Sequence, residues 1–142
     1  MVLKACRILF DAHKDDTDKG GYPYVFHPFY LATCMDDEIT ACVALLHDVI
    51  EDHGDRFSFE SLRGEGFPEE VIAALRLLTH RKEVPYPDYV KAIAADPVAA
   101  RVKMADLRHN LDARRTDGRP PKKEAQYREA LAYLESLYGT KK

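Results

Sequence analysis

The sequence predicts an all-α protein, a compact helical bundle of six to seven helices in a single domain over residues 1–142. Apolar residues recur every three to four positions, as they do on one face of a helix. Proline and glycine separate the periodic segments, and no stretch of useful length alternates between apolar and polar residues as a strand does. With 46% hydrophobic and 32% charged residues, the chain has an ordinary globular composition and enough length to bury a core.

The first third of the chain alternates helix and loop. Apolar groups recur at a helical period over residues 2–14, which predicts the first helix. Residues 14–24 contain two adjacent glycines and a proline, so they are predicted to form a loop, a place where function is common. The dipeptide His27-Pro28 begins the next helix, because proline suits the first helical turn.

The middle of the chain is predicted to form two helices with a short helical segment between them. The acidic run 36–38 matches the positive end of a helix dipole and begins a helix over about 39–52. Ser58 is a good cap for the short segment, which ends at Leu62. Pro68 begins the second of the two helices, which carries a continuous apolar stripe.

The last third is also helical. One helix is predicted over about 87–95. Asp96 and Pro97 then form a typical start, an N-cap followed by a first-turn proline. Residues 117–121 form a loop, and an amphipathic helix spans about 123–138.

Composition excludes several classes of protein. The net charge of −3 gives no reason to expect nucleic-acid or membrane binding, and no apolar run approaches the roughly 20 residues of a membrane span. Charges interrupt the apolar pattern of the N-terminus, so it is not a signal peptide. The three cysteines form no CxxC pair and are odd in number, which indicates reduced thiols in a cytoplasmic protein.

The strongest chemical signal is a group of ionisable residues in the apolar run 44–52. On one continuous helix these side chains fall within an arc of roughly 140°. An imidazole and three carboxylates on an apolar helix are costly to bury without a cation, and this donor set suits Mn, Fe, Zn or Ni better than Ca or Mg. A solvated helix edge is the alternative reading. The residues are His47, Asp48, Glu51 and Asp52.

Residues elsewhere favour the metal site. His27 at a helix start, the pair His47-Asp48 and Asp106 in a late helix offer two imidazoles and two carboxylates. Such a set suits one transition-metal ion with positions left for water. The remaining histidines are predicted as core or helix-end residues and not as ligands; they are His13, His53, His80 and His109.

Three motifs together resemble the HD-domain phosphohydrolases, and more narrowly the hydrolase domain of the RelA/SpoT family, including its small stand-alone alarmone hydrolases and the metazoan SpoT homologues. The motifs are PY-x-x-HP at 23–28, LLHD-x-x-ED at 45–52 and K-x-AD-x-x-HN at 103–110. They occur in the family's order and span most of the chain. No synthetase domain is expected within these residues.

The resemblance implies a function for eight residues. His27, His47, Asp48 and Asp106 match the family's metal ligands, usually for Mn²⁺, although Fe, Zn or Ni suits the same donors. Glu51 and Asp52 match its catalytic pair, and Lys19 and Asn110 match positions near the bound nucleotide. The implied reaction is hydrolysis of guanosine 3′,5′-bis(diphosphate), (p)ppGpp, to GDP or GTP and pyrophosphate. The implied partner is this small-molecule nucleotide, with no nucleic acid, no membrane and an open oligomeric state.

Two alternatives stay open. Residues 105–110 read Ala-Asp-Leu-Arg-His-Asn where the family often has Ala-Asp-Arg-Leu-His-Asn, and the loop around Lys19 is less basic than usual. These differences leave room for an HD hydrolase of another nucleotide, such as a nucleotide or NADPH phosphatase, or for a nucleotide-binding module without catalysis. Basic residues that could attract a polyphosphate, though most also fit a solvated surface, are Arg101, Lys103, Arg108, Arg114, Arg115, Arg119, Lys122, Lys123 and Arg128.

Overall fold

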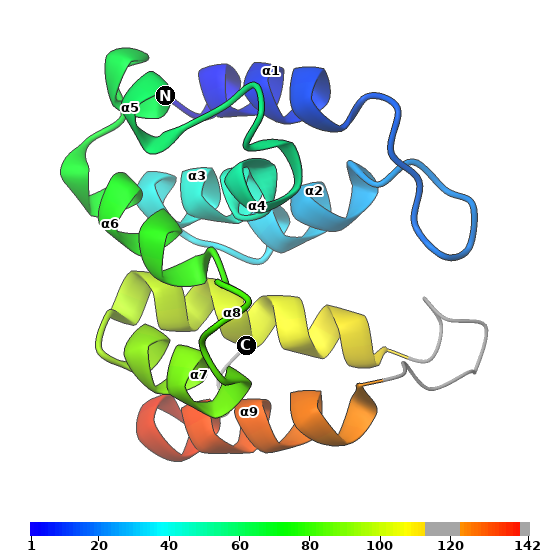
Figure 1. Ribbon diagram of the computed structural model, residues 1–142, viewed down its shortest axis with the longest axis vertical. Helices are drawn as coiled ribbons and strands as arrows, with labels where there is room; N and C mark the ends of the chain where they lie inside the picture. Colours follow the sequence, from blue (N-terminus) through cyan, green and yellow to red (C-terminus); the bar gives the residue numbers. More distant parts are fainter. Residues whose placement is uncertain (113–122, 140–142) are drawn as a thin grey trace.

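The computed structural model describes residues 1–112 and 123–139, and these residues form nine helices and no strand. The all-α prediction is confirmed (Figure 1), whereas the helix count exceeds the six to seven expected. Within this part of the chain, no helix is both long and apolar enough to cross a membrane. The helices are α1 (Val2–His13), α2 (Phe26–Thr33), α3 (Glu38–Leu46), α4 (Val49–His53), α5 (Phe59–Gly64), α6 (Glu69–Leu78), α7 (Tyr86–Ala94), α8 (Pro97–Leu111) and α9 (Glu124–Tyr138).

Side-chain caps hold three of the helix starts that the sequence predicts. The Asp37 carboxylate accepts a hydrogen bond from the Thr40 backbone N–H at 2.8 Å, at the start of α3. Ser58 and Ser61 form a reciprocal capping box at the start of α5. The Asp96 carboxylate accepts from the first backbone N–H groups of α8. Each cap satisfies donors that lack a helical partner, which is worth about 1 kcal/mol.

The single helix predicted over about 39–52 is wrong, because the chain breaks at His47 and Asp48. α3 ends at Leu46 and α4 begins at Val49. His47 Nδ1 donates to the Ala44 carbonyl at 2.8 Å, the oxygen that the next helical turn would otherwise use. Asp48 has φ −109° and ψ 0°, outside the helical region. The four charged residues therefore do not share one continuous helical arc.

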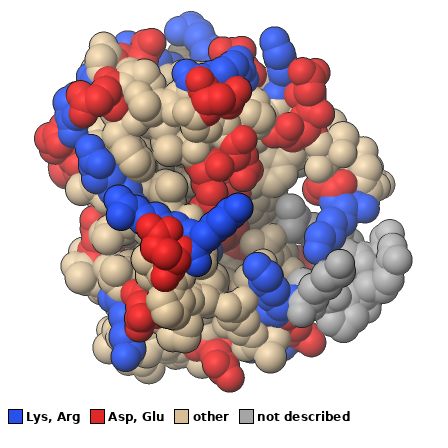
Figure 2. Space-filling model, viewed as in Figure 1, with Lys and Arg blue, Asp and Glu red and all other residues tan. Residues whose placement is uncertain are grey.

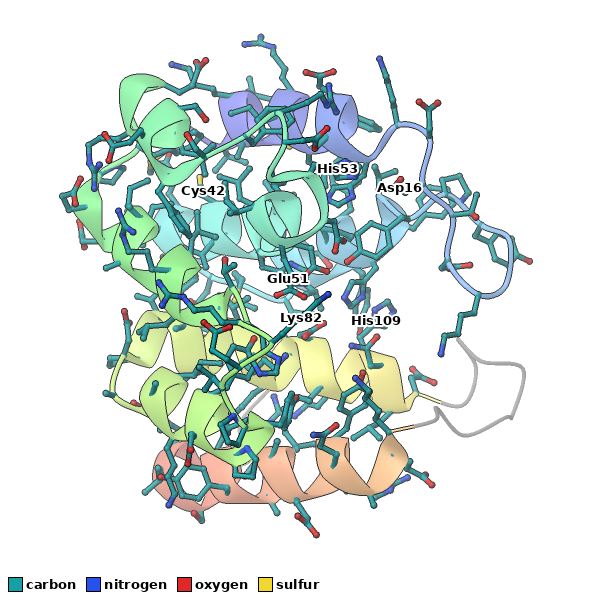
Figure 3. All side chains as sticks on the ribbon, viewed as in Figure 1. Asp16, Cys42, Glu51, His53, Lys82 and His109 are labelled. Atoms are coloured by element: carbon teal, nitrogen blue, oxygen red, sulfur yellow. The ribbon has the colours of Figure 1, made fainter. Side chains whose placement is uncertain are left out.

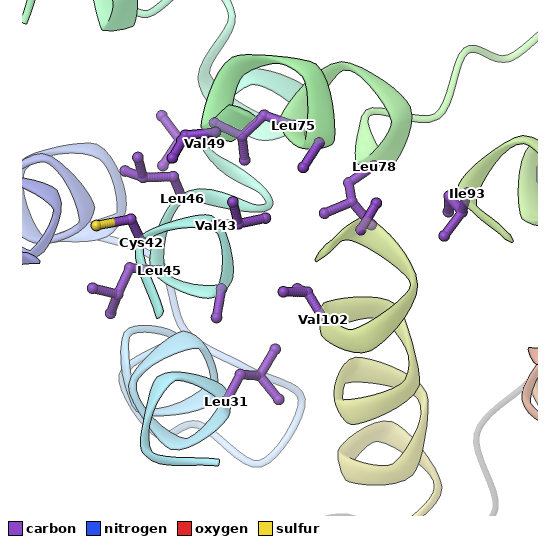
Figure 4. Close-up of a cluster of buried hydrophobic side chains, with 14 of the residues drawn as sticks. Leu31, Cys42, Val43, Leu45, Leu46, Val49, Leu75, Leu78, Ile93 and Val102 are labelled. Carbon is purple, nitrogen blue, oxygen red and sulfur yellow. The ribbon is translucent and has the colours of Figure 1, made fainter. Parts of the chain in front are cut away.

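α3 lies at the centre of the core (Figure 4), and it packs against α1, α2, α6 and α8. Its residues Val43, Leu45 and Leu46 are at most 1% exposed. α8 packs on the other side against α7 and α9. Since α3 and α8 also contact each other and α2, polar side chains of these three helices meet over a rigid hydrophobic base.

The predicted loop after α1 is confirmed and folds back on itself. Asp18 Oδ1 accepts hydrogen bonds from the backbone N–H groups of Gly20 and Tyr22 at 2.9 and 3.0 Å. Gly21 has φ +84°, a conformation that glycine adopts without strain. An isolated bridge between residues 17 and 23 closes the loop. The loop thus leads the chain from α1 to Tyr24, which lies beside the site described next.

Candidate metal centre and pocket

Three buried side chains from separate helices meet at one point. His27 comes from the first turn of α2, His47 from the end of α3 and Asp106 from the middle of α8. His27 Nε2 lies 2.8 Å from Asp106 Oδ1, and His47 Nε2 lies 3.6 Å from the same oxygen. Each residue offers one ligand atom, and these atoms all lie within 4.8 Å of one another.

Asp48, the fourth expected ligand, lies next to this group. Its Oδ2 is 3.2 Å from His47 Nε2, and the Tyr24 hydroxyl donates a hydrogen bond to the same oxygen. The break between α3 and α4 places Asp48 there, because a continuous helix would turn it about 100° away from His47. The structure therefore brings His27, His47 and Asp106 together and places Asp48 beside His47.

The His47 ring is oriented for a ligand. Its Nδ1 is occupied by the Ala44 carbonyl, which leaves Nε2 as the nitrogen that points toward Asp48 and Asp106. This Nε2 is buried and makes no hydrogen bond within the described residues. A buried imidazole nitrogen that faces two carboxylates and makes no well-aligned hydrogen bond fits a transition-metal ion well.

His27 is held by His109, a histidine that was not predicted from the sequence to belong to the site. The Nδ1 atoms of His27 and His109 are 2.6 Å apart, and the two rings stack with centroids 4.9 Å apart. His109 stacks in turn on Tyr30, with centroids 4.4 Å apart. His109 is thus a packed histidine, as predicted, but it also orients His27. The sequence could have indicated this role, because His109 lies three residues after Asp106 on α8 and residues at that spacing share a helix face.

Neighbouring positive charge keeps the Asp106 carboxylate ionised. Lys103 Nζ lies 3.2 Å from Asp106 Oδ2, and Asn110 Nδ2 donates to Asp106 Oδ1 at 3.1 Å. Burial by itself would raise the pKa of Asp106, but Lys103, His27 and His47 lower it well below its usual range. Burial likewise opposes protonation of His47, yet Asp48 and Asp106 raise its pKa well above the usual value. The carboxylates therefore stay ionised and attract positive charge.

The two residues of the predicted catalytic pair, Glu51 and Asp52, lie in different environments. Glu51 Oε1 accepts a hydrogen bond from the His80 backbone N–H at 2.8 Å, which fixes this carboxylate near the centre (Figure 3). The pKa of Asp52 is raised to about 6 by partial burial and by the nearby Asp48 and Glu51. A carboxyl group that titrates near neutrality is suited to accepting or donating a proton.

A pocket of about 260 Å³ opens beside the metal-binding group. Six of the eight predicted site residues line it: His27, His47, Asp48, Glu51, Asp106 and Asn110. Asp52 and Lys19 are not part of its wall, and Lys19 is exposed on the loop after α1. Several other lining residues were not predicted from the sequence to belong to the site, among them His80, Tyr86 and Tyr89.

The predicted basic cluster is only partly directed at this pocket. Lys103 and Lys123 line it, whereas Arg101 binds Asp36. Arg108 binds Glu135 and Arg128 binds Glu124, so these cations pair with carboxylates on α9. On the face shown in Figure 2, acidic and basic side chains are interspersed. Four members of the predicted cluster lie outside the described residues: Arg114, Arg115, Arg119 and Lys122.

Comparison with known proteins agrees with these observations, although no family model matches the chain. The chain is 35% identical over 150 residues to the bifunctional (p)ppGpp synthase/hydrolase SpoT of Escherichia coli (strain K12), covering 96% of this chain and 21% of that protein. It is 33% identical over 135 residues to the guanosine-3′,5′-bis(diphosphate) 3′-pyrophosphohydrolase of Vibrio cholerae, covering 85% of this chain and 19% of that protein. The chain thus spans about a fifth of the length of these curated relatives.

A solved structure extends the similarity to the fold. It is that of a metazoan ortholog of SpoT, reported to hydrolyse ppGpp, and it matches with a TM-score of 0.76 and 25% sequence identity. The match covers 98% of this chain and 86% of the other. The chain is therefore similar over nearly its whole length to one part of the SpoT proteins, and it shares the all-α fold of the metazoan SpoT ortholog.

Proposed function

We propose that this chain is a metal-dependent (p)ppGpp 3′-pyrophosphohydrolase with Mn²⁺ as its cofactor. The observation that carries the proposal is the buried group of His27, His47 and Asp106 in the wall of a polar pocket, beside the anchored carboxylate of Glu51. The E. coli relative and the metazoan ortholog, both described as hydrolysing (p)ppGpp, support the choice of substrate.

His27, His47, Asp48 and Asp106 would hold the metal ion. Two imidazoles and two carboxylates suit Mn²⁺, and also Fe, Zn or Ni. When bound, such an ion lowers the pKa of a coordinated water and neutralises phosphate charge. The residues around these ligands keep them in place, since Tyr24 donates to Asp48 and the Ala44 carbonyl orients His47.

The pocket offers groups for both ends of a nucleotide. Lys103 and Lys123 supply positive charge for phosphate oxygens. Tyr86 and Tyr127 supply aromatic surface, on which a purine base can stack. Asn110 lies in the pocket wall beside Asp106. Lys19 is exposed on the loop after α1, and we propose that it contacts the substrate from that loop.

Hydrolysis requires a bond to form between a water oxygen and the phosphorus attached to the ribose 3′-oxygen, while the bond from that phosphorus to the 3′-oxygen breaks. Glu51, or Asp52 with its raised pKa, takes the water proton and passes it to the departing 3′-oxygen. The hydrogen bond from the His80 N–H holds Glu51 in a fixed position for this transfer. Positioning and charge neutralisation supply most of the acceleration in phosphoryl transfer.

An end-point assay tests the proposal. Purified protein is incubated with guanosine tetraphosphate and either Mn²⁺ or EDTA, and the products are resolved by ion exchange. We expect GDP and pyrophosphate only in the presence of metal. Asp106→Asn and the double variant Glu51→Gln/Asp52→Asn should lose turnover, while the exposed control Glu70→Gln keeps it. Turnover retained in Asp106→Asn would refute the assignment.

A second candidate function, hydrolysis of a different nucleotide, is favoured by two observations. Lys19 lies outside the pocket wall, and Arg108 binds Glu135 on α9 and not the pocket. Both positions concern recognition of the substrate and leave the metal ligands intact. A panel of nucleotides and NADPH separates the candidates: guanosine tetraphosphate left intact while a simpler nucleotide is cleaved would favour the second.

A further inference from the structure

A second group of metal-ligating side chains lies at the junction of α1, α4 and the loop between α1 and α2. His13 is the last residue of α1, His53 is the last residue of α4, and Asp16 lies in the loop. Asp16 Oδ2 is 2.8 Å from His13 Nδ1 and 2.6 Å from His53 Nε2. In Figure 3, Asp16 and His53 lie beside each other, away from Glu51 and His109.

We propose that His13, Asp16 and His53 bind a second divalent transition-metal ion, of the zinc type. Their ligand atoms all lie within 4.8 Å of one another. Ligands at 2.0–2.1 Å from a tetrahedral zinc ion are about 3.3 Å apart, so small side-chain movements suffice to seat the ion. Two imidazoles and one carboxylate form a usual zinc donor set, with a fourth position left for water.

The surroundings of the group fit a ligand site. The His13 side chain is 1% exposed, and its Nε2 is buried without a hydrogen-bond partner in the described residues. Its polar contact is therefore made entirely through Nδ1, toward Asp16. The Asp16 and His53 side chains are 35% and 22% exposed, so an ion and its water can reach the group from solvent.

The group is separate from the first centre but adjacent to it. The His13 ring packs against Tyr24 with centroids 4.8 Å apart, and the Tyr24 hydroxyl donates to Asp48 of the first centre. The two sets share no ligand. An ion bound by His53 fastens the end of α4 to the loop, and α4 carries both carboxylates of the predicted catalytic pair. The site therefore supports the position of α4 without contacting the substrate pocket.

The competing explanation is a hydrogen-bonded triad, in which Asp16 accepts from both imidazoles and no metal binds. Counting zinc ions distinguishes the two. Metal is removed from the full chain with EDTA, the chain is saturated with zinc, and unbound zinc is removed. The zinc content per chain is then measured by elemental mass spectrometry. We expect two ions per chain in the wild type and one in His53→Asn. The control His80→Asn, the same change at a histidine outside both groups, should keep two.

A spectroscopic measurement locates the ion. Addition of zinc should shift the ¹⁵N resonances of the His53 and His13 rings in the wild type, and the shift of His13 should be lost in His53→Asn. If His53→Asn does not fold, Asp16→Asn in the exposed loop is used in its place. Equal zinc content in the wild type and the variant, with unshifted His53 and His13 resonances, would overturn the proposal. Neither measurement uses turnover, so failure here is distinguishable from failure of the proposed activity.

Discussion

Replacement of Lys103 by Met tests the charge balance of the first centre. Lys103 Nζ lies 3.2 Å from Asp106 Oδ2 and within 5.8 Å of the ring centroids of Tyr86 and Tyr89. Met keeps the apolar stem and removes the charge. Loss of one partner of a buried ion pair costs about 3–5 kcal/mol, because the other charge stays buried. Asp106 retains other donors, so we expect the lower end, about 3 kcal/mol, in metal-free protein.

Urea unfolding in EDTA at neutral pH, followed by helical circular dichroism, measures this cost. The matched control is Lys91→Met, the same change at an exposed lysine on α7, which should stay within about 0.5 kcal/mol of the wild type. A loss below about 1 kcal/mol in Lys103→Met would refute the reasoning, because it would mean that the Asp106 charge does not depend on Lys103.

The same variant also tests the ligand assignment. The Lys103→Met substitution removes a positive charge beside Asp106, and a divalent ion bound there replaces it. Saturating Mn²⁺ should therefore reduce the loss in free energy of unfolding of Lys103→Met relative to the wild type. By linkage, each 1.4 kcal/mol of reduction corresponds to about tenfold tighter metal binding by the variant. A deficit that is the same with Mn²⁺ and with EDTA would show that Asp106 does not contact the ion.

Three further predictions concern the support of the site, the core and the thiols. Tyr24→Phe removes the hydroxyl that donates to Asp48, so metal titration should show about 10–100-fold weaker binding, and an unchanged affinity would contradict that role. Leu46→Ala, at a fully buried position of α3, should lower the free energy of unfolding in urea by about 3–5 kcal/mol, and a change under 1 kcal/mol would count against the central place of α3. Burial raises the pKa of Cys42 to about 11, so its reactive thiolate is scarce at mildly alkaline pH and increases only as pH approaches that value. Peptide mapping should find the exposed Cys34 alkylated and Cys42 intact until the protein unfolds; early modification of Cys42 would contradict this order.

Much of the fold follows from local sequence, because helix formation depends on neighbours within a turn or two. The starts of α3, α5 and α8 are decided by Asp37, Ser58 and Asp96, whose side chains reach backbone groups two or three residues away. The loop after α1 follows from its glycines and proline in the same way. The ligand types of the first centre could also be predicted from the sequence, since imidazoles and carboxylates within an apolar pattern need a partner when buried.

The tertiary structure decided which of these groups meet. His27 and Asp106 are 79 residues apart in sequence, and only the packing of α2 against α8 brings their atoms to 2.8 Å. The break at His47 and Asp48 depends on a side chain competing for a helix carbonyl, an outcome that hydrophobic periodicity does not report.

The same reason explains the residues that sequence reasoning left out. His13 and His53 appeared as ordinary helix-end histidines, and Asp16 as one charge among several in an acidic loop. Their convergence requires the end of α1 and the end of α4 to lie side by side, a contact that no local pattern encodes. Arg108 likewise counted as a possible phosphate ligand until the packing of α8 on α9 paired it with Glu135. Sequence thus determined the helices and the chemistry available, whereas long-range packing determined which side chains form a site.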